Sequence, residues 1–112
     1  MAGILRGDIR WANLDPSIGH EQSGFRPVLI LSADVFNRNS GTVIAVAITG
    51  KKPRADYPLT LVLDNVDMPK KSWVKISQIR TLSVERIGER ITALSEVTIS
   101  QVIEGLNEIL GQ

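Results

Sequence analysis

Cysteine is absent from the 112 residues, and histidine occurs once, at His20. Without cysteine the chain can form neither a disulfide nor a thiolate zinc site, and it has no cysteine nucleophile. A single histidine excludes a two-histidine acid–base pair within one chain. Arginine, carboxylates, hydroxyl groups and one imidazole are therefore the groups that remain for catalysis.

An excess of one charge is also missing, because 13 basic and 12 acidic side chains give a net charge of +1. Any phosphate site must therefore be a local patch. The carboxylates show no metal-ligand spacing, and Asp64 and Asp67 are interpreted as solvated turn residues, so we expect no metal and no cofactor. No G-x-S-x-G motif or P-loop is present. No signal-peptide pattern or membrane-length apolar run occurs, and together with the lack of cysteine this favours a cytoplasmic protein.

The length predicts one domain over residues 1–112. The composition, with 43% hydrophobic and 22% charged residues, is that of an ordinary globular protein. Alternating or continuous apolar segments predict short strands. The segments are residues 8–14, 28–31, 43–48, 59–63 and 72–76. Polar and glycine-containing stretches predict loops at 17–24 and at 37–41, the second with one helical turn before it.

The C-terminus changes to a helical period, with Ser95 as a predicted N-cap and Leu94 packing onto Ile99 across it. Gly105 weakens this helix by about 1 kcal/mol relative to alanine. We interpret its apolar stripe as core packing. The stripe consists of Ile99, Val102, Ile103, Leu106, Ile109 and Leu110. Short strands followed by one helix predict a mostly β fold, a small barrel with a C-terminal helix against it.

Two predicted strand ends carry residues suited to phosphate chemistry. Glu21 and Arg26 flank a glycine-containing loop, Arg26 immediately precedes Pro27, and Thr49 ends the other long apolar strand. If these strands are neighbours, a guanidinium and a hydroxyl meet at one rim, where both can donate hydrogen bonds to a phosphate. A solvated rim arginine and a strand-capping threonine are equally compatible with the pattern.

Lys51, Lys52 and Arg54 follow Thr49 in a loop, where they either guide a phosphate backbone or form a solvated turn.

The aromatic residues are few and fall into two groups. Trp11 and Trp73 lie in predicted strands, so we expect them in the core. Phe25 and Tyr57 lie in predicted loops and are the better candidates for stacking on bases.

Several short segments occur in the order and spacing typical of MazF/PemK toxins. They are RGDI at 6–9, LDP at 14–16, GHEQ at 19–22, GFRPV at 24–28, FNR at 36–38, AIT at 47–49 and QIRT at 78–81. Each is weak alone, but together they cover nearly the whole chain in register. The sequence therefore resembles the MazF/PemK (Kid) family of toxins from type II toxin–antitoxin systems.

This resemblance implies an SH3-like small β-barrel, the fold of the CcdB/PemK plasmid-maintenance toxins, assembled as a homodimer. It also implies a sequence-specific, metal-independent endoribonuclease that leaves 2′,3′-cyclic phosphate and 5′-hydroxyl ends on single-stranded RNA. The implied partner is a MazE-like antitoxin, whose disordered acidic segment covers the RNA groove and whose degradation frees the toxin to arrest growth.

The resemblance also assigns roles within the site. It makes Arg26 and Thr49 the catalytic pair and Glu21 the loop glutamate that helps to activate the attacking 2′-hydroxyl. Around them we expect RNA contacts from five further side chains. These are His20, Gln22, Phe25, Lys51 and Gln78.

Two positions depart from the Kid branch, in which a histidine, an arginine and an acid were proposed as the catalytic group. His20 matches, but Lys75 takes the arginine position and Ser77 that of the acid. This favours the mechanism based on Arg26 and Thr49.

Two alternatives remain open. A CcdB-like gyrase poison shares the fold, although its tryptophan-containing C-terminal tail is missing here. A catalytically weakened homologue that acts by binding is also compatible with Ser77.

Overall fold

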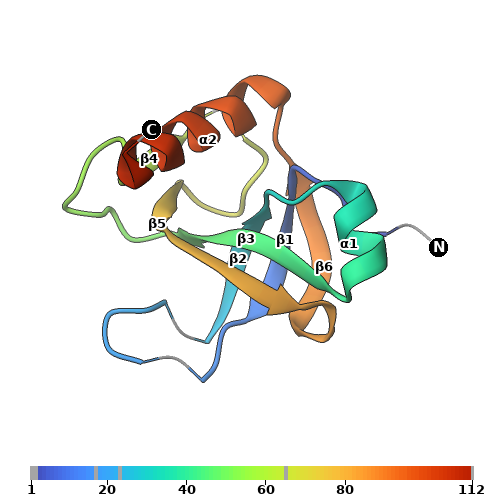
Figure 1. Cartoon of the computed structure of the whole chain (residues 1–112). Coiled ribbons are helices and arrows are strands. Elements are labelled where there is room, and N and C mark those ends of the chain that lie inside the picture. The colour runs from blue at the N-terminus through green and yellow to red at the C-terminus, as the bar shows by residue number, and fades with distance from the viewer. Residues whose placement is uncertain (1–2, 17, 23, 65, 112) are drawn as a thin grey trace.

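The computed structural model describes residues 3–16, 18–22, 24–64 and 66–111. Ser17 and Ser23, which belong to the predicted loop at 17–24, lie outside these ranges. Six strands and two α-helices follow one another along the chain (Figure 1). They are β1 (Asp8–Asn13), β2 (Phe25–Ile30), α1 (Asp34–Ser40), β3 (Thr42–Thr49), β4 (Thr60–Leu63), β5 (Ser72–Ser83), β6 (Ile87–Ala93) and α2 (Glu96–Leu110), with a short 3-10 turn, Val84–Arg86, between β5 and β6.

The strands form one antiparallel sheet in the order β4-β5-β3-β2-β1-β6. The predicted mostly β class with a C-terminal helix is confirmed, although the sheet is open between β4 and β6 rather than closed into a barrel. Figure 1 shows α2 lying across one side of the sheet, while the β1–β2 loop projects on the other.

Strand β3 is buried on both faces, which explains its continuous apolar run. Val46 and Ile48 belong to the core beneath α2, together with Ile99 of that helix. Val43 and Ala47 point to the other face and belong to a second core. We call these the helix face and the loop face of the sheet.

The predicted strands are confirmed, but β5 continues to Ser83 and β6 was not predicted. Strand β6 lies at the sheet edge and carries no fully buried residue, so its sequence lacks a clear apolar pattern.

The predicted loop at 37–41 is wrong in most of its length, because Asn37, Asn39 and Ser40 lie in α1. Asn37 is buried, and its amide donates hydrogen bonds to the carbonyls of Ile4 (2.9 Å) and Ser32 (3.1 Å). These tertiary contacts satisfy an asparagine that would otherwise favour a turn.

Helix α2 begins as predicted, with the Ser95 hydroxyl accepting a hydrogen bond from the Thr98 backbone N–H at 3.3 Å. Leu94 and Ile99 belong to the same core. The prediction that Ile109 and Leu110 extend the buried stripe is wrong, since they are 37% and 65% exposed. The last turn of the helix extends beyond the core that the preceding turns cover.

Gly105 allows α2 to approach β5 closely. A Cβ atom at this position would lie 2.8 Å from Ile76 Cδ1 and 3.1 Å from the carbonyl oxygen of Pro58. Alanine would gain about 1 kcal/mol of helix propensity but cost about 1–3 kcal/mol through overpacking. We therefore expect Gly105→Ala to lower the free energy of unfolding in urea, by about 1 kcal/mol. Asn107→Ala, at an exposed position of the same helix, should be neutral or slightly stabilising; a Gly105→Ala protein more stable than wild type would contradict this packing argument.

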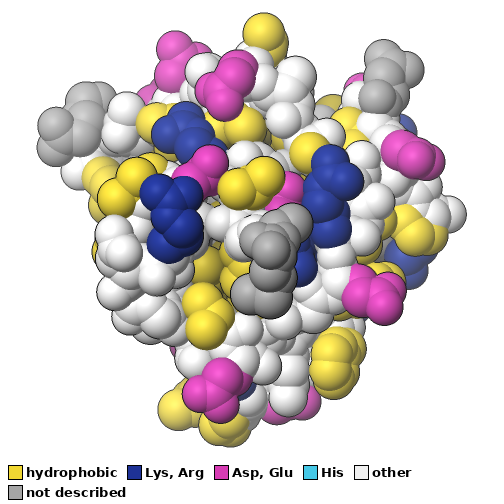
Figure 2. Space-filling view, turned by 90° about the vertical axis from the view of Figure 1, so that its right-hand side faces the viewer, with side chains coloured by type: hydrophobic (Ala, Val, Ile, Leu, Met, Phe, Trp, Pro, Cys, Tyr) yellow, Lys and Arg dark blue, Asp and Glu magenta, His cyan; other side chains and the backbone are white. Residues whose placement is uncertain are grey.

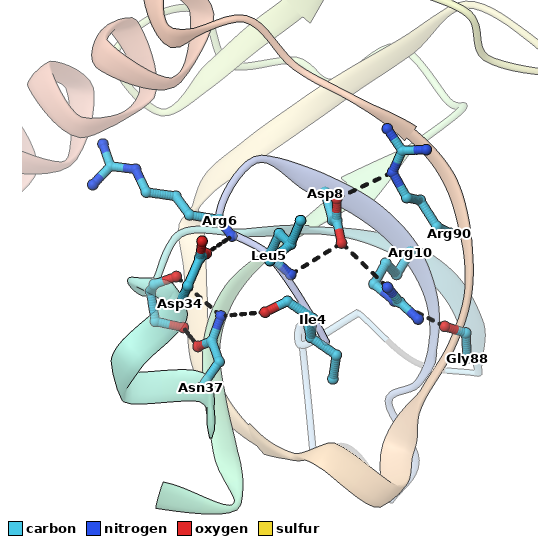
Figure 3. A network of polar contacts seen from close by, with 10 residues as sticks. Ile4, Leu5, Arg6, Asp8, Arg10, Asp34, Asn37, Gly88 and Arg90 are labelled. Carbon is cyan, nitrogen blue, oxygen red and sulfur yellow. Dashed lines mark hydrogen bonds and ion pairs between the residues drawn. The ribbon is translucent and has the colours of Figure 1, made fainter. Parts of the chain in front are cut away.

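Asp8 joins the N-terminal segment to β1 and β6 (Figure 3). Its carboxylate, 3% exposed, accepts hydrogen bonds from Arg10 Nη1 at 3.2 Å and Arg90 Nε at 3.1 Å. It also accepts one from the Leu5 backbone N–H at 3.1 Å. On the face of the molecule that carries α1 and the N-terminal segment, acidic and basic side chains are intermixed (Figure 2). This mixture agrees with the expectation that any phosphate site is a local patch.

Candidate active site

The pairing of β2 with β3 brings Arg26 and Thr49 together. Val28 pairs with Ala47 in an antiparallel register, so two further steps along each strand place Arg26 opposite Thr49. Both side chains share the face of Val28 and Ala47, which is the loop face. Arg26 is exposed and Thr49 is 7% exposed. The condition set by the sequence, that the two strands be neighbours, is therefore met.

The Thr49 hydroxyl is oriented by the turn that follows it. Its Oγ1 accepts a hydrogen bond from the Lys51 backbone N–H at 3.2 Å. A hydroxyl carries one hydrogen and two lone pairs, so an accepted bond leaves that hydrogen able to donate. The turn thus fixes a donor at the end of β3, on the face of the sheet that also carries Arg26.

The same row of the sheet continues beyond Thr49. Thr49 pairs with Trp73 of β5, which in turn pairs with Val62 of β4. The expectation that Trp73 is a core residue is wrong: it is partly exposed and belongs to neither buried cluster. The alternation with the buried Val74 and Ile76 places Trp73 on the loop face, at a position to which the second core does not extend.

An irregularity in β5 places Gln78 on the loop face. Val46 pairs with Ile79, whereas Ala47, the next residue, pairs with Lys75. The residues 76–78 therefore form a bulge opposite β3, a device that re-aims side chains next to functional sites. Ser77 is exposed in this bulge.

The β1–β2 loop is attached to this part of β5. The Gln22 backbone N–H donates to Gln78 Oε1 at 3.3 Å, and Gln78 Nε2 donates to the His20 carbonyl at 3.4 Å. Lys75 Nζ donates to Gln22 Oε1 at 3.2 Å. The structure thus brings His20, Gln22 and Gln78 together, as their common assignment required, and adds Lys75.

Glu21 lies exposed in the same loop, where its Oε1 accepts a hydrogen bond from the Ile18 backbone N–H at 2.7 Å. Two arginines hold the base of the loop. Arg80 Nη1 donates to the Leu14 carbonyl at 3.5 Å, and Arg86 Nη1 donates to the carbonyls of Asn13 and Asp15. Sequence reasoning missed both arginines, since their partners are backbone groups more than 60 residues away along the chain.

Phe25 begins β2 and is 69% exposed. It lines a cavity of about 280 Å³ with Trp11, Pro27 and Met68. Arg26 also borders this cavity. The expectation that Trp11 is a core residue is wrong, since it is 39% exposed at this cavity.

Lys51 and Tyr57 lie in the β3–β4 loop, and both are exposed. The Tyr57 hydroxyl donates to the Gln101 carbonyl of α2 at 3.1 Å. Desolvation raises the pKa of this phenol, and the negative charges of Glu108 and Glu104 raise it further. Tyr57 therefore stays protonated at neutral pH and tethers the loop to the helix, which makes it a weaker candidate for base stacking than its loop position predicts.

Within the described ranges, no group of three or more His, Asp or Glu residues is arranged to hold a metal ion. None of the helices described here has the length and apolar character needed to cross a membrane.

Comparison with known proteins identifies the family of this chain. The sequence profile of PemK-like, MazF-like toxins of type II toxin–antitoxin systems matches residues 5–110. The chain is 36% identical over 105 residues to endoribonuclease EndoA of Bacillus subtilis (strain 168), an alignment that covers 92% of this chain and 90% of EndoA.

Solved structures of this family have the same fold as this chain. The crystal structure of MazF from Deinococcus radiodurans superposes with a TM-score of 0.87 at 26% identity, covering all of both chains. A MazE–MazF structure from the same organism gives a TM-score of 0.80 at 26% identity, covering 100% of this chain and 99% of that one. This chain therefore belongs to the PemK-like, MazF-like toxin family of type II toxin–antitoxin systems.

Proposed function

We propose that this chain is a sequence-specific, metal-independent endoribonuclease whose active site is centred on Arg26 and Thr49. The observation that carries the proposal is the register of β2 and β3, which, continued two residues beyond the paired Val28 and Ala47, sets Arg26 and Thr49 opposite one another on the loop face. The relationship to the endoribonuclease EndoA supports RNA as the substrate.

The reaction that suits this site is attack of a 2′-oxygen on the adjacent phosphorus. A bond forms between the 2′-oxygen and phosphorus, the bond from phosphorus to the 5′-oxygen breaks, and a 2′,3′-cyclic phosphate and a 5′-hydroxyl result. Negative charge grows on the phosphoryl oxygens, where Arg26 and the Thr49 hydroxyl act as preorganised donors. Arginine stays charged, since its pKa lies above about 12, so it stabilises charge rather than moving a proton.

Proton transfer then falls to the β1–β2 loop. Glu21 takes the proton of the 2′-hydroxyl, and His20 returns a proton to the departing 5′-oxygen. The bonds from Gln78 to His20 and Gln22 support this assignment, because they hold the loop against the sheet.

Gln78→Ala is expected to release this loop while leaving the core intact. We expect kcat/KM for RNA cleavage to fall roughly tenfold, because the catalytic groups lose part of their fixed geometry. Amide hydrogen exchange in residues 18–22 should accelerate at the same time. Ser77→Ala, the neighbouring exposed position, is the matched control and should change neither quantity; unchanged cleavage by Gln78→Ala would remove the loop from the mechanism.

The partners follow from the family. We propose a single-domain chain that works in the cytoplasm as a homodimer and is neutralised by a cognate MazE-like antitoxin. The MazE–MazF structures among its relatives support the antitoxin. An acidic antitoxin segment that folds on binding would place carboxylates where the RNA phosphates otherwise lie.

The comparisons favour an RNA-cleaving toxin over the gyrase-poison alternative, since the relatives are endoribonucleases and MazF toxins. A cleavage assay distinguishes the remaining alternative, a homologue that binds RNA or antitoxin without cutting RNA.

The deciding experiment incubates the purified chain with a long single-stranded RNA in EDTA and identifies the ends produced. Defined cuts that leave cyclic phosphate and 5′-hydroxyl ends are the expected result. Cutting that requires added Mg²⁺ would refute metal independence. If the folded protein cuts none of several different RNAs, the chain acts by binding alone. An antitoxin titration and a gyrase-trapping assay would then identify the partner that it binds.

A further inference from the structure

We propose that Trp73 is the platform on which one base of the RNA stacks, in a subsite next to the catalytic pair. This inference rests on the proposed ribonuclease function and deepens it by naming a residue that selects and positions the substrate.

The register of the sheet places Trp73 one strand away from the catalytic pair. Trp73 pairs with Thr49, and the register of β2 and β3, continued two residues beyond Val28 and Ala47, adds Arg26 to the same row on the loop face. Residues directly opposite one another on neighbouring antiparallel strands have Cα atoms about 5 Å apart. A nucleotide whose phosphate lies between Arg26 and Thr49 therefore has its own base, or the next one, within reach of the indole.

The indole lines a cavity of about 290 Å³. Its lining residues are Lys52, Pro53, Ala55, Asp56, Tyr57, Thr60, Val62 and Trp73. This volume lies near the lower end of the range for small-molecule sites, about 300–1,000 Å³, which suits one planar base. Val62, 38% exposed, extends the apolar surface beside the ring.

Charge decides which part of a nucleotide enters this cavity. Asp56 belongs to its lining, so a phosphate there would meet a carboxylate, whereas a base carries no such penalty. Two basic groups lie close to the ring. Lys71 Nζ lies over one face of the indole, 5.8 Å from its centre, and Lys52 lines the cavity. Both lysines are exposed on long, flexible stems, so their charged ends can contact the RNA backbone while a base stacks on the ring.

The other tryptophan is also partly exposed but lies on the opposite face of the sheet. Trp11 shares the alternation of Ile9, a residue of the core beneath α2, and it lines the separate cavity that Phe25 and Arg26 border. Both indoles are therefore solvent-accessible, and only that of Trp73 lies in the row of Arg26 and Thr49.

Fluorescence tests whether RNA reaches the ring. Trp11→Phe leaves Trp73 as the only tryptophan, and Trp73→Phe leaves Trp11. Each protein is titrated with a 2′-O-methyl copy of the RNA that the wild type cuts best, or with 2′-O-methyl homo-oligomers of A, C and U when it cuts none. We expect saturable quenching in the protein that keeps Trp73. Quenching that is absent there would overturn the proposal.

Abasic substitution tests whether stacking contributes to cleavage. Each nucleotide around the mapped cut is made abasic in turn, and kcat/KM is measured for the wild type, Trp73→Leu and Trp73→Phe. One position should cost the wild type roughly 5–150-fold, the equivalent of about 1–3 kcal/mol for one stacked base. Trp73→Leu keeps apolar bulk but has no ring, so the penalty at that position should nearly vanish. Trp73→Phe should restore part of it.

A full abasic penalty in Trp73→Leu at every position would show that Trp73 does not stack on the RNA. Failure of the ribonuclease function itself gives a different result, namely no cutting by the wild type, and the fluorescence titration still decides the fate of Trp73 in that case.

Discussion

Replacing Arg26 with alanine is expected to lower kcat/KM for RNA cleavage by roughly a hundredfold or more, the usual cost of removing a well-placed charge stabiliser. The register of β2 and β3 gives the reason, since it sets the guanidinium opposite the Thr49 hydroxyl, where the phosphoryl charge grows. The loss should appear mainly in kcat, because the donor matters most in the transition state. Single-turnover cleavage of a short RNA that contains one cut site measures it directly.

The fold should survive this substitution, because Arg26 is exposed at the beginning of β2. Circular dichroism and urea unfolding should therefore match the wild type, and antitoxin binding should persist. Arg26→Lys keeps the charge but loses the planar fork of donors, so we expect it to recover only part of the rate.

Arg54→Ala is the matched control for charge, since it removes an exposed arginine from the β3–β4 loop. It should weaken RNA binding a few-fold in a manner that depends on salt, and leave the rate of the bound complex unchanged. If Arg26→Ala cuts RNA within a few-fold of the wild type, the active site lies elsewhere.

The parts of the fold that the sequence predicted are those with a strong local signal. The apolar run of β3 and the helical period of α2 can each be read from one continuous segment, because each segment's own pattern shows which of its residues are buried. Strand β6 and the second half of β5 carry exposed and half-buried residues, so their pairing depends on strands distant in sequence. Asn37 also depends on contacts distant in sequence. Its buried amide donates hydrogen bonds to backbone carbonyls, and these bonds stabilise a helical position for a residue type that favours loops.

The candidate site likewise has a part that the sequence predicts and a part that only the fold reveals. Residue type and strand ends were enough to propose Arg26 and Thr49, but only the pairing of β2 with β3 brings them opposite one another. The link between Gln78 and the β1–β2 loop spans 56 residues, and no local pattern encodes it. Trp73 was misjudged because a tryptophan in a strand is usually buried, and because alternation with Val74 and Ile76 determines its face of the sheet but not how far the second core extends on that face.

Removing the Asp8 carboxylate is expected to have the largest effect on stability. Asp8 is 3% exposed and interacts with Arg10, whose side chain is 19% exposed, and with Arg90, which is 56% exposed (Figure 3). Breaking a buried ion pair from one side costs about 3–5 kcal/mol, because the remaining charge is left without its partner. Solvent reaches Arg90, so we expect a somewhat smaller loss for Asp8→Ala, about 3 kcal/mol.

The loss should appear in urea unfolding as a lower midpoint with an unchanged slope, and in heating as a melting temperature lower by roughly 10 °C or more. Glu96→Ala provides the matched control. Glu96 also pairs with an arginine, Arg6, at 4.0 Å, but these two side chains are 79% and 38% exposed. Surface pairs of this kind contribute about 0–1 kcal/mol, so Glu96→Ala should be close to neutral.

Activity separates the structural role of Asp8 from a catalytic one. In β1, Ala12 lies opposite Arg26, and Asp8 stands four residues earlier. At about 3.3 Å per residue this is roughly 13 Å along the strand, too far for direct contact with the phosphate. Well below its melting temperature, Asp8→Ala should therefore cut RNA at close to the wild-type rate. A loss of stability no larger than that of Glu96→Ala would show that the two arginines do not depend on this carboxylate, and that other contacts hold β1 against β6.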